Sequence, residues 1–321
     1  MAARPDCHAE PVIELRRITA DHLTPLLDEE TSAWRSQLEW DYRPSADLVR
    51  RFVHIRALSG FALMDGARIV GYSYYVCEES KGLIGDLYVR RDYRTAENER
   101  ALFEAVVTAL RQTPEVRRVE AQIMMLGSPL ERLASRQNRF ESYPRYYLRA
   151  GLGSALRLPP RELPDIDITL WREELHQNTA RLIAAAYEGH IDSQVNDQYC
   201  SPAGASRFLM NIVQYPGCGS FFAAASYAAI DSHTGELAGI SLTSLIAADV
   251  GHITQVCVAP SHKGTGLGYE LMRRSLLALG AHGCRSVSLT VTAANEPALR
   301  LYQRMGFEHR HNFAAYVWQA R

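Results

Sequence analysis

The stretch best suited to chemistry is residues 256–272, VCVAPSHKGTGLGYELM. An apolar, strand-like run leads to a proline, a basic residue and three glycines, Gly264, Gly266 and Gly268, before a helical pattern begins. Glycine lets a ligand approach the backbone closely, and the first N–H groups of a helix have no partner within the helix. Because the helix dipole favours negative charge at that end, this turn could hold a phosphate or pyrophosphate.

The spacing of the glycines excludes two well-known phosphate loops. The dinucleotide fingerprint needs G-x-G-x-x-G and an acid about 20 residues later, whereas these glycines alternate and residues 284–291 contain no acid. The nucleoside-triphosphate loop needs Lys after its last glycine, whereas Lys263 precedes the glycines and Tyr269 follows them. What remains is a general anion cup at a helix N-terminus, or an ordinary strand-to-helix turn that uses glycine for its positive φ.

The composition indicates a globular protein with a large core. Of 321 residues, 47% are apolar and 22% charged, and 35 Lys and Arg nearly balance 36 Asp and Glu. This balance supplies no basic field for nucleic acid. The longest uncharged apolar stretch, 220–230, reads as a buried strand and is too short to cross a bilayer. With no secretory pattern at the start, we expect a soluble, cytoplasmic protein with no membrane or nucleic-acid partner.

The six cysteines include no CxxC pair and no close histidine partner at ligand spacing. They indicate reduced, mostly buried thiols and no metal site.

The order of predicted elements is similar in the two halves of the chain, with a Gly- and Pro-rich segment at 151–164 between them. Three anchor pairs recur at separations of 167–169 residues: Gly71 and Gly239, Val89 and Val258, Phe140 and Phe307. We therefore predict a duplicated domain, with one copy at residues 1–155 and the other at 156–321.

Two motifs carry a resemblance to a known family. Residues 256–272 resemble the acetyl-CoA-binding signature of the GCN5-related N-acetyltransferase (GNAT) family, an apolar strand followed by [QR]-x-x-G-x-[GA] and a helix. Residues 295–307, NEPALRLYQRMGF, are similar to its second signature, N-x-x-A-x-x-L-Y-x-x-x-G-F. The resemblance covers residues 165–321 well. It implies an α/β protein of two tandem acyl-CoA N-acyltransferase (GNAT) folds, each a mixed, mostly antiparallel twisted sheet flanked by helices.

The resemblance implies acetyl-CoA as co-substrate, bound by the C-terminal domain. Backbone N–H groups of residues 263–268 would take the pyrophosphate, with Lys263 where most members have Gln or Arg. Residues 256–258 would pair with the pantetheine arm as an added strand. The implied cofactor-binding residues are Val256, Cys257, Val258, Lys263, Gly264, Thr265, Gly266, Leu267, Gly268, Tyr269, Asn295 and Tyr302.

The first copy lacks these ligand-binding residues. The positions aligned with Lys263 and the three glycines hold Arg94, Thr95, Glu97 and Glu99. Two carboxylates in a pyrophosphate cup would repel the ligand. We predict a degenerate N-terminal domain that does not bind acetyl-CoA in the family's way.

The resemblance implies that Tyr302 protonates the departing thiolate, and its ordinary pKa of about 10 keeps it a donor. The general base is harder to assign, because Thr254 and Gln255 before Val256 are not bases. His252 is the candidate, since a pKa of about 6.5 suits proton removal at neutral pH, with a purely structural histidine as the alternative. Cys257 on a buried strand is expected to be inert rather than a nucleophile.

The predicted function is transfer of an acetyl group from acetyl-CoA to a primary amine of a small molecule or peptide, by direct attack in a ternary complex. Acceptor specificity is expected to come from residues 175–215, whose acids, amides and aromatics suit a polar amine. The alternative is a non-catalytic acyl-CoA-binding sensor or interaction module. Two copies in one chain are compatible with a monomer or a homodimer.

Overall fold

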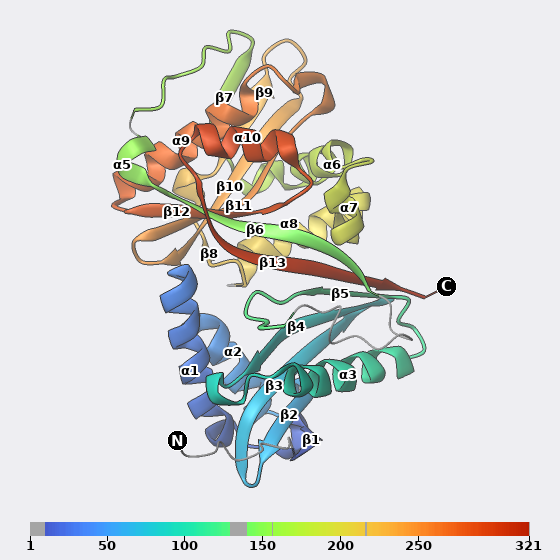
Figure 1. The fold of residues 1–321 in the computed structure, drawn as a ribbon. Helices are drawn as coiled ribbons and strands as arrows, with labels where there is room; N and C mark the ends of the chain where they lie inside the picture. The colour runs from blue at the N-terminus through green and yellow to red at the C-terminus, as the bar shows by residue number, and fades with distance from the viewer. Residues whose placement is uncertain (1–9, 129–139, 156, 216, 321) are drawn as a thin grey trace. The chain divides into compact units, whose positions relative to one another are not determined.

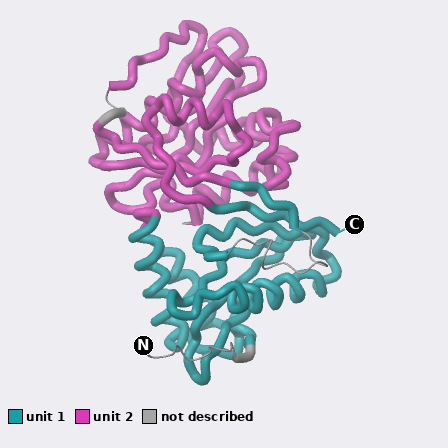
Figure 2. The backbone as a smooth tube through the Cα atoms, in the orientation of Figure 1, with its two compact units in different colours: residues 1–37, 42–144, 313–321 teal, residues 38–41, 145–312 magenta. Residues whose placement is uncertain are grey.

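The computed structural model describes residues 10–128, 140–155, 157–215 and 217–320. They form two compact units (Figure 2). Unit 1 draws on residues 1–37, 42–144 and 313–321, and unit 2 consists of residues 38–41 and 145–312. The sequence predicted one boundary, after residue 155. The compact units instead alternate along the chain, because residues 145–151 add a strand to the sheet of unit 2 and residues 315–319 add one to that of unit 1.

Unit 1 is a mixed sheet in the order β1-β2-β3-β4-β5-β13, antiparallel except for the parallel pair β4–β5 (Figure 1). Its elements are β1 (Glu10–Glu14), α1 (Ala20–Leu38), α2 (Arg43–His54), β2 (Ser59–Asp65), β3 (Arg68–Glu78), β4 (Lys81–Val89), α3 (Ala96–Gln112) and β5 (Arg118–Gln122), completed by part of β13 (Glu308–Gln319). The sequence of residues 129–140, PLERLASRQNRF, predicts a helix, but this segment lies almost entirely outside the described residues.

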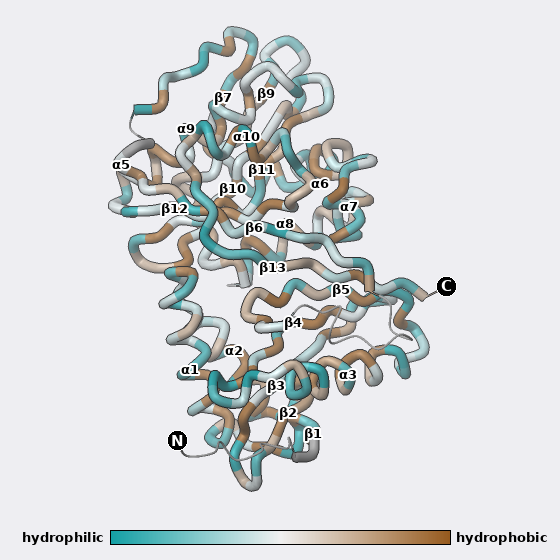
Figure 3. The backbone as a smooth tube through the Cα atoms, viewed as in Figure 1, coloured by the Kyte–Doolittle hydropathy of each residue, from teal (hydrophilic) through white to brown (hydrophobic). Residues whose placement is uncertain are grey.

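Helix α3 covers one face of this sheet. It begins at the N-cap Thr95, whose hydroxyl accepts the Asn98 N–H at 3.3 Å. Its apolar residues recur every three or four positions, as an amphipathic helix requires, and they are buried against the strands: Leu102, Phe103, Val106, Val107 and Leu110. Figure 3 shows the apolar residues along the central strands and on α3 that make this core.

Unit 2 has a second mixed sheet, in the order β6-β12-β11-β10-β9-β7, antiparallel except for the parallel pair β11–β12. Its strands are β6 (Glu141–Gly151), β7 (Ile166–Leu170), β8 (Ser220–Phe221), β9 (Tyr227–Asp231), β10 (Leu237–Ala247), β11 (Val250–Val258) and β12 (Ser286–Thr292). Its helices are α5 (Leu152–Ala155), α6 (His176–Ala186), α7 (Ile191–Val195), α8 (Pro202–Gln214), α9 (Leu267–His282) and α10 (Glu296–Arg304). One face of the sheet packs on α6 and α8, and the other on α9.

The strand pairing confirms the register of the duplication. Gly71 pairs with Val89 in unit 1, and Gly239 pairs with Val258 in unit 2. A Cβ added at Gly71 would lie 3.0 Å from Leu102, and one added at Gly239 would lie 2.9 Å from Leu271, each on the covering helix. The close approach of helix and strand therefore accounts for a glycine at both positions.

A buried polar cluster joins α1 to the sheet of unit 1. Glu30 is 0% exposed and Asp86 4% exposed, and the two carboxyl groups share a hydrogen bond. Tyr72 and Trp34 donate to Glu30 at 2.8 and 3.4 Å, and Tyr42 donates to Asp86 at 2.7 Å. Burial, and secondly the charge of Asp86, raise the pKa of Glu30 well above its ordinary value. Burial also raises the pKa of Asp86.

All five cysteines within the described residues are free thiols. The prediction that most cysteines are buried is wrong for this set, since Cys77, Cys200 and Cys218 are exposed and only Cys257 and Cys284 are buried. The exposed three lie near the end of a hairpin or in connecting segments. Among the described residues, every helix is too short or too polar to cross a bilayer.

The raised pKa of Glu30 predicts a stability that falls with rising pH. The folded protein keeps a proton that the unfolded chain releases at about pH 4.3, so stability is lost as pH rises through the folded pKa. We expect the urea-unfolding free energy, followed by tryptophan fluorescence, to fall as the pH rises above about 4.3 and to level off once the pH exceeds the folded-state pKa of Glu30. In Glu30→Gln the fall should be smaller, because the amide still donates to Asp86 but does not titrate.

Glu30→Ala serves as the comparison for this prediction. It removes the acceptor of Tyr72 and Trp34 and should cost about 1–3 kcal/mol at every pH. Equal pH slopes in the wild type and Glu30→Gln would show that Glu30 is not the titrating group.

Candidate active site

In unit 2, strands β11 and β12 stop pairing near the middle of β11. Parallel pairing joins Val250–Ile253 to Ser286–Leu289 and stops there, although both strands continue. At this point Thr254 forms a bulge opposite β10, and a bulge bends a strand and increases its twist. Among the described residues, the segment of β11 beyond Ile253 is paired only with β10. Its other edge can accept an extended chain.

The predicted glycine turn follows directly. Pro260–His262 form a single 3-10 turn, and Gly264 and Gly266 adopt positive φ values of 83° and 96°. Gly266 is the N-cap of α9 and supplies no side-chain acceptor. Gly266 itself therefore engages none of the first N–H groups of α9, although that of Leu267 donates to the Thr265 hydroxyl at 3.4 Å. A side chain at either glycine would be strained.

The corresponding turn of unit 1 is filled by its own side chains. Thr95 caps α3, and Arg94 donates to the carbonyl of Val89 at 3.1 and 3.2 Å. Glu99 is 1% exposed and accepts the Gly127 N–H at 2.7 Å. In unit 2 an anion could approach the corresponding turn. In unit 1 the side chains of that turn instead form hydrogen bonds within the same unit.

The other residues of the unit 2 turn shape it through internal contacts. Lys263 Nζ donates to the carbonyl of Ala186, the last residue of α6, at 3.3 Å. The Thr265 hydroxyl donates to the His262 carbonyl at 2.8 Å. Leu267 is buried in the core beneath α9, and the Tyr269 hydroxyl donates to the Pro159 carbonyl at 2.8 Å.

A basic side chain that sequence reasoning missed also borders the turn. A Cβ added at Gly266 would lie 2.9 Å from Arg161 Nε. The Arg161 N–H donates at 3.0 Å to Glu270 Oε2 in the first turn of α9, which fixes this segment over the glycines. Its place in a Pro-rich connecting segment gave no signal in the sequence.

Successive side chains of the open segment of β11 point to opposite faces. Val256 packs beneath α9, whereas Cys257 packs with α6 and α8. Burial raises the pKa of Cys257 to about 12, and the charge of Lys263 acts in the opposite direction. Cys257 is therefore a neutral thiol at physiological pH, a poor nucleophile. The side chains of residues 256–258 are thus packed in the core, and what this segment can offer a ligand is its backbone N–H and C=O groups.

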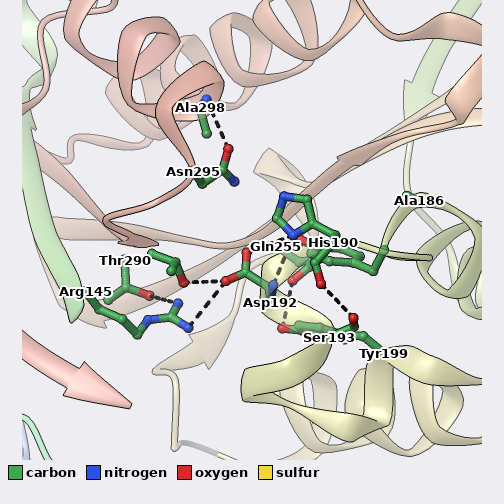
Figure 4. A network of polar contacts seen from close by, with 12 residues as sticks. Arg145, Ala186, His190, Asp192, Ser193, Tyr199, Gln255, Thr290, Asn295 and Ala298 are labelled. Carbon is green, nitrogen blue, oxygen red and sulfur yellow. Dashed lines mark hydrogen bonds and ion pairs between the residues drawn. The ribbon is translucent and has the colours of Figure 1, made fainter. Parts of the chain in front are cut away.

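Helix α10 carries Asn295 and Tyr302. Asn295 is its N-cap and accepts the Ala298 N–H at 3.3 Å (Figure 4). Tyr302 is 7% exposed. Burial raises its pKa, the charge of Asp192 raises it further, and Arg145 lowers it. Tyr302 therefore keeps its proton at physiological pH and can act as a donor.

His252 lies in the paired part of β11, before the bulge. Its Nδ1 is 2.9 Å from Ser288 Oγ, and its ring packs against Trp40 and Tyr147 with centroid distances of 5.2 and 6.5 Å. Burial lowers its pKa to about 4, so the ring is neutral at pH 7. These contacts are those of a structural histidine, and the mechanism proposed below does not use it.

A polar network lies at the end of β12, on the face that packs on α6 and α8. Asp192, in the first turn of α7, accepts a short hydrogen bond from Thr292, the last residue of β12. Arg145 Nη1 lies 3.9 Å from Asp192 Oδ1, while its Nη2 donates to Thr290 at 3.3 Å. Figure 4 shows the Asp192 and Arg145 side chains pointing toward one another.

Two stacked tyrosines complete this network from the side of β11. Gln255 donates to the Tyr187 hydroxyl at 2.8 Å and accepts from the Tyr199 hydroxyl at 3.4 Å. The two rings stack at 4.5 Å. Burial raises the pKa of both, so both hydroxyls stay protonated. Tyr187 also lines a cavity of about 430 Å³ formed by α6, the turn after it, α7 and the start of α8.

Residues 196–307 match the model of the acetyltransferase (GNAT) family. The chain carries a GNAT domain. Over 79 residues it is 39% identical to a mycothiol acetyltransferase of Saccharopolyspora erythraea, across 25% of this chain and 26% of that protein. Over 74 residues it is 39% identical to the streptothricin acetyltransferase of Streptomyces lavendulae, across 23% of this chain and 39% of that protein. The matches thus span well under half of these relatives.

Solved structures extend the likeness to the whole chain. A tandem GNAT protein from the clavulanic acid biosynthesis pathway covers 98% of this chain and 99% of its own, with a TM-score of 0.66 and 16% identity. A GCN5-related N-acetyltransferase from Sphaerobacter thermophilus covers 96% and 95%, with a TM-score of 0.64 and 15% identity. At this identity the likeness concerns the fold. It confirms the predicted architecture of two GNAT folds in tandem.

The glycine turn of this GNAT domain provides a test that separates folding from ligand binding. A Cβ at Gly268 would meet Val258 at an ordinary 3.5 Å, so the fold itself does not require glycine there. We expect Gly268→Ala to unfold within about 2 °C of the wild type but to bind acetyl-CoA at least about 10-fold more weakly. The reason is that its methyl group would stand before the first N–H groups of α9.

Thermal unfolding and calorimetric titration would measure the two effects. Gly266→Ala is the matched comparison, because its positive φ predicts a loss of about 1–2 kcal/mol in stability. Full acetyl-CoA affinity in Gly268→Ala would show that no ligand approaches this turn.

Proposed function

We propose that the C-terminal domain transfers an acetyl group from acetyl-CoA to a primary amine of a small molecule or peptide. One observation supports this more than any other: the open edge of β11 leads within a few residues to the uncapped N-terminus of α9. An arm that carries amides could pair with the strand edge, and a pyrophosphate joined to it would meet the helix. Coenzyme A has this order of groups.

Two cations support the anion-binding end. Arg161 borders Gly266, and the Lys263 ammonium lies within hydrogen-bond distance of the end of α6. In this proposal Arg161 neutralises the phosphates from outside the turn. The Lys263 ammonium makes the electrostatic potential at the turn more positive, and its hydrogen bond to Ala186 holds the loop in place. The proposed cofactor contacts otherwise come from the backbone of residues 256–258 and 263–268, with Asn295 at the start of α10.

The proposed reaction is direct attack. The neutral amine forms a C–N bond to the thioester carbon, and the oxygen charge that develops is stabilised by a backbone N–H near Val256. When the C–S bond breaks, Tyr302 gives its proton to the sulfur and regains one from the nitrogen. Cys257 takes no part, because its thiol is buried and neutral. The products are an N-acetyl amine and free coenzyme A.

We infer that the N-terminal domain does not bind acetyl-CoA, since Thr95, Arg94 and Glu99 fill its turn. Calorimetric titration of the whole protein should therefore give one acetyl-CoA site per chain and no site for ATP or NAD. Two equivalent sites would contradict the inference about the first domain. No binding at all would contradict both the transferase and the non-catalytic acyl-CoA sensor.

Tyr302→Phe tests the enzyme against the sensor. We expect it to bind acetyl-CoA normally and to slow amine-dependent release of free thiol by about 100-fold, the usual contribution of a general acid. A thiol-reactive dye would follow release with a panel of primary amines. Cys257→Ala should retain amine-dependent release, because the reaction has no acyl-cysteine intermediate. Tight acetyl-CoA binding with no release for any amine would favour the sensor.

A further inference from the structure

The proposed reaction needs a group that binds the amine, and the Asp192 carboxylate is the candidate. It lies on α7, where β12 ends and the sheet opens, and its side chain is 13% exposed. Its charge influences the pKa of both Tyr302 and Tyr187. A carboxylate near the proposed thiolate donor is where an attacking nitrogen would have to arrive.

The two oxygens of Asp192 are unequally occupied. Oδ1 accepts the hydroxyl of Thr292 and lies 3.9 Å from Arg145, longer than a hydrogen bond. Oδ2 lies 3.5 Å from His190 Nδ1. That nitrogen already accepts the backbone N–H of Asp192 at 3.1 Å, so in this arrangement it is an acceptor and not a donor to Oδ2. Among the hydrogen bonds of the described residues, none is donated to Oδ2.

Arg145 places a positive charge beside this carboxylate. Its guanidinium donates to Thr290 and faces Asp192 without bonding it closely. The guanidinium lies nearest to Oδ1, at 3.9 Å, and so leaves Oδ2 able to accept from a ligand. The tyrosine pair and Gln255 form the adjoining wall, and their hydroxyl and amide groups are already engaged with each other.

We propose that Asp192 binds the acceptor as a protonated primary amine and takes its proton. This rests on the proposed transferase function and names the substrate class: an ammonium ion rather than an uncharged nucleophile. One N–H proton passes to Asp192 and on to water, and the freed lone pair attacks the thioester carbon. Tyr302 protonates the departing sulfur and regains the second N–H proton, so the turnover releases one proton to solvent.

The first arm of the test compares two nucleophiles in Asp192→Asn. For alkylamines that are protonated at neutral pH, kcat/KM should fall by about 100-fold or more. For hydroxylamine, which is uncharged at neutral pH, it should fall by less than about 3-fold, because the uncharged nucleophile needs no carboxylate. Glu188→Gln is the matched control, since it removes an exposed carboxylate from the preceding turn. An equal loss for both nucleophiles, or no loss, would overturn the proposal.

The second arm does not depend on turnover. Saturation-transfer NMR would measure binding of n-butylammonium, with n-butanol as its uncharged counterpart, to the whole protein. The wild type and Glu188→Gln should bind the ammonium ion, and Asp192→Asn should not. If the wild type and Asp192→Asn gave the same signal, the ammonium site would be wrong. If the wild type bound the ion but released no thiol with any amine, the transferase would be wrong and the ammonium site would stand.

Discussion

Four residues of parallel pairing hold β11 against β12, and the end of that pairing determines what unit 2 can bind. Beyond Ile253, the bulge at Thr254 turns β11 away, and a row of backbone groups loses its neighbour on one side. An open edge in the middle of a sheet is costly unless something covers it. The glycine turn, the N-terminus of α9, Tyr302 and the Asp192 network lie around this opening, so the places proposed for cofactor, acid and amine all depend on one local change in strand pairing.

Unit 1 has the same opening and closes it from within. Its parallel pairing joins Lys81–Ile84 to Arg118–Ala121 and stops at a bulge at Gly85. A Cβ at Gly85 would lie 2.1 Å from the ring of Tyr74, so that ring lies directly against the bulge. Asp86, the next residue, is sealed by hydrogen bonds to Tyr42 and Glu30. Aligned with Asp86 in unit 2 is Gln255, which faces Tyr187 and Tyr199. The duplication thus kept a polar residue at the bulge in both copies, buried as a carboxyl pair in one and bordering the proposed acceptor site in the other.

The features that could be predicted from the sequence are local ones. Positive φ at Gly264 and Gly266, the cap at Asn295 and the pairing of Gly239 with Val258 each follow from residues near one another or from the repeat. Local reasoning failed where the pattern was ambiguous. The apolar run 220–230, predicted to be a strand, contains a 3-10 turn at Ala223–Ala225, because small alanines fit a turn as readily as a strand. Residues 12–19, VIELRRIT, have a sequence typical of a strand, yet β1 ends at Glu14 and a 3-10 turn follows at Leu15–Arg17.

The burial of His252 could not be predicted at all. Its neutral state follows from Ser288, Trp40 and Tyr147, which come from three distant segments, and no pattern along the chain shows that they converge. The Asp192 network is hidden for the same reason. The acidic loop suggested an acceptor region, but a carboxylate acquires its role from its neighbours, and the cation beside it belongs to a strand that the sequence assigned to the other domain.

Residues 145–151 of β6 pair with β12 over its full length, and Arg145 stands opposite Thr292. Because side chains alternate across a strand, a slip of one residue would turn Arg145 to the opposite face and away from Asp192. The same pairing also covers the outer edge of β12, which would otherwise be exposed. The electrostatic potential at the proposed ammonium site therefore depends on Arg145, a residue that precedes the predicted domain boundary at residue 155. This gives a physical reason to retain the first copy: its last strand belongs to the sheet of unit 2, and that strand places Arg145 beside Asp192.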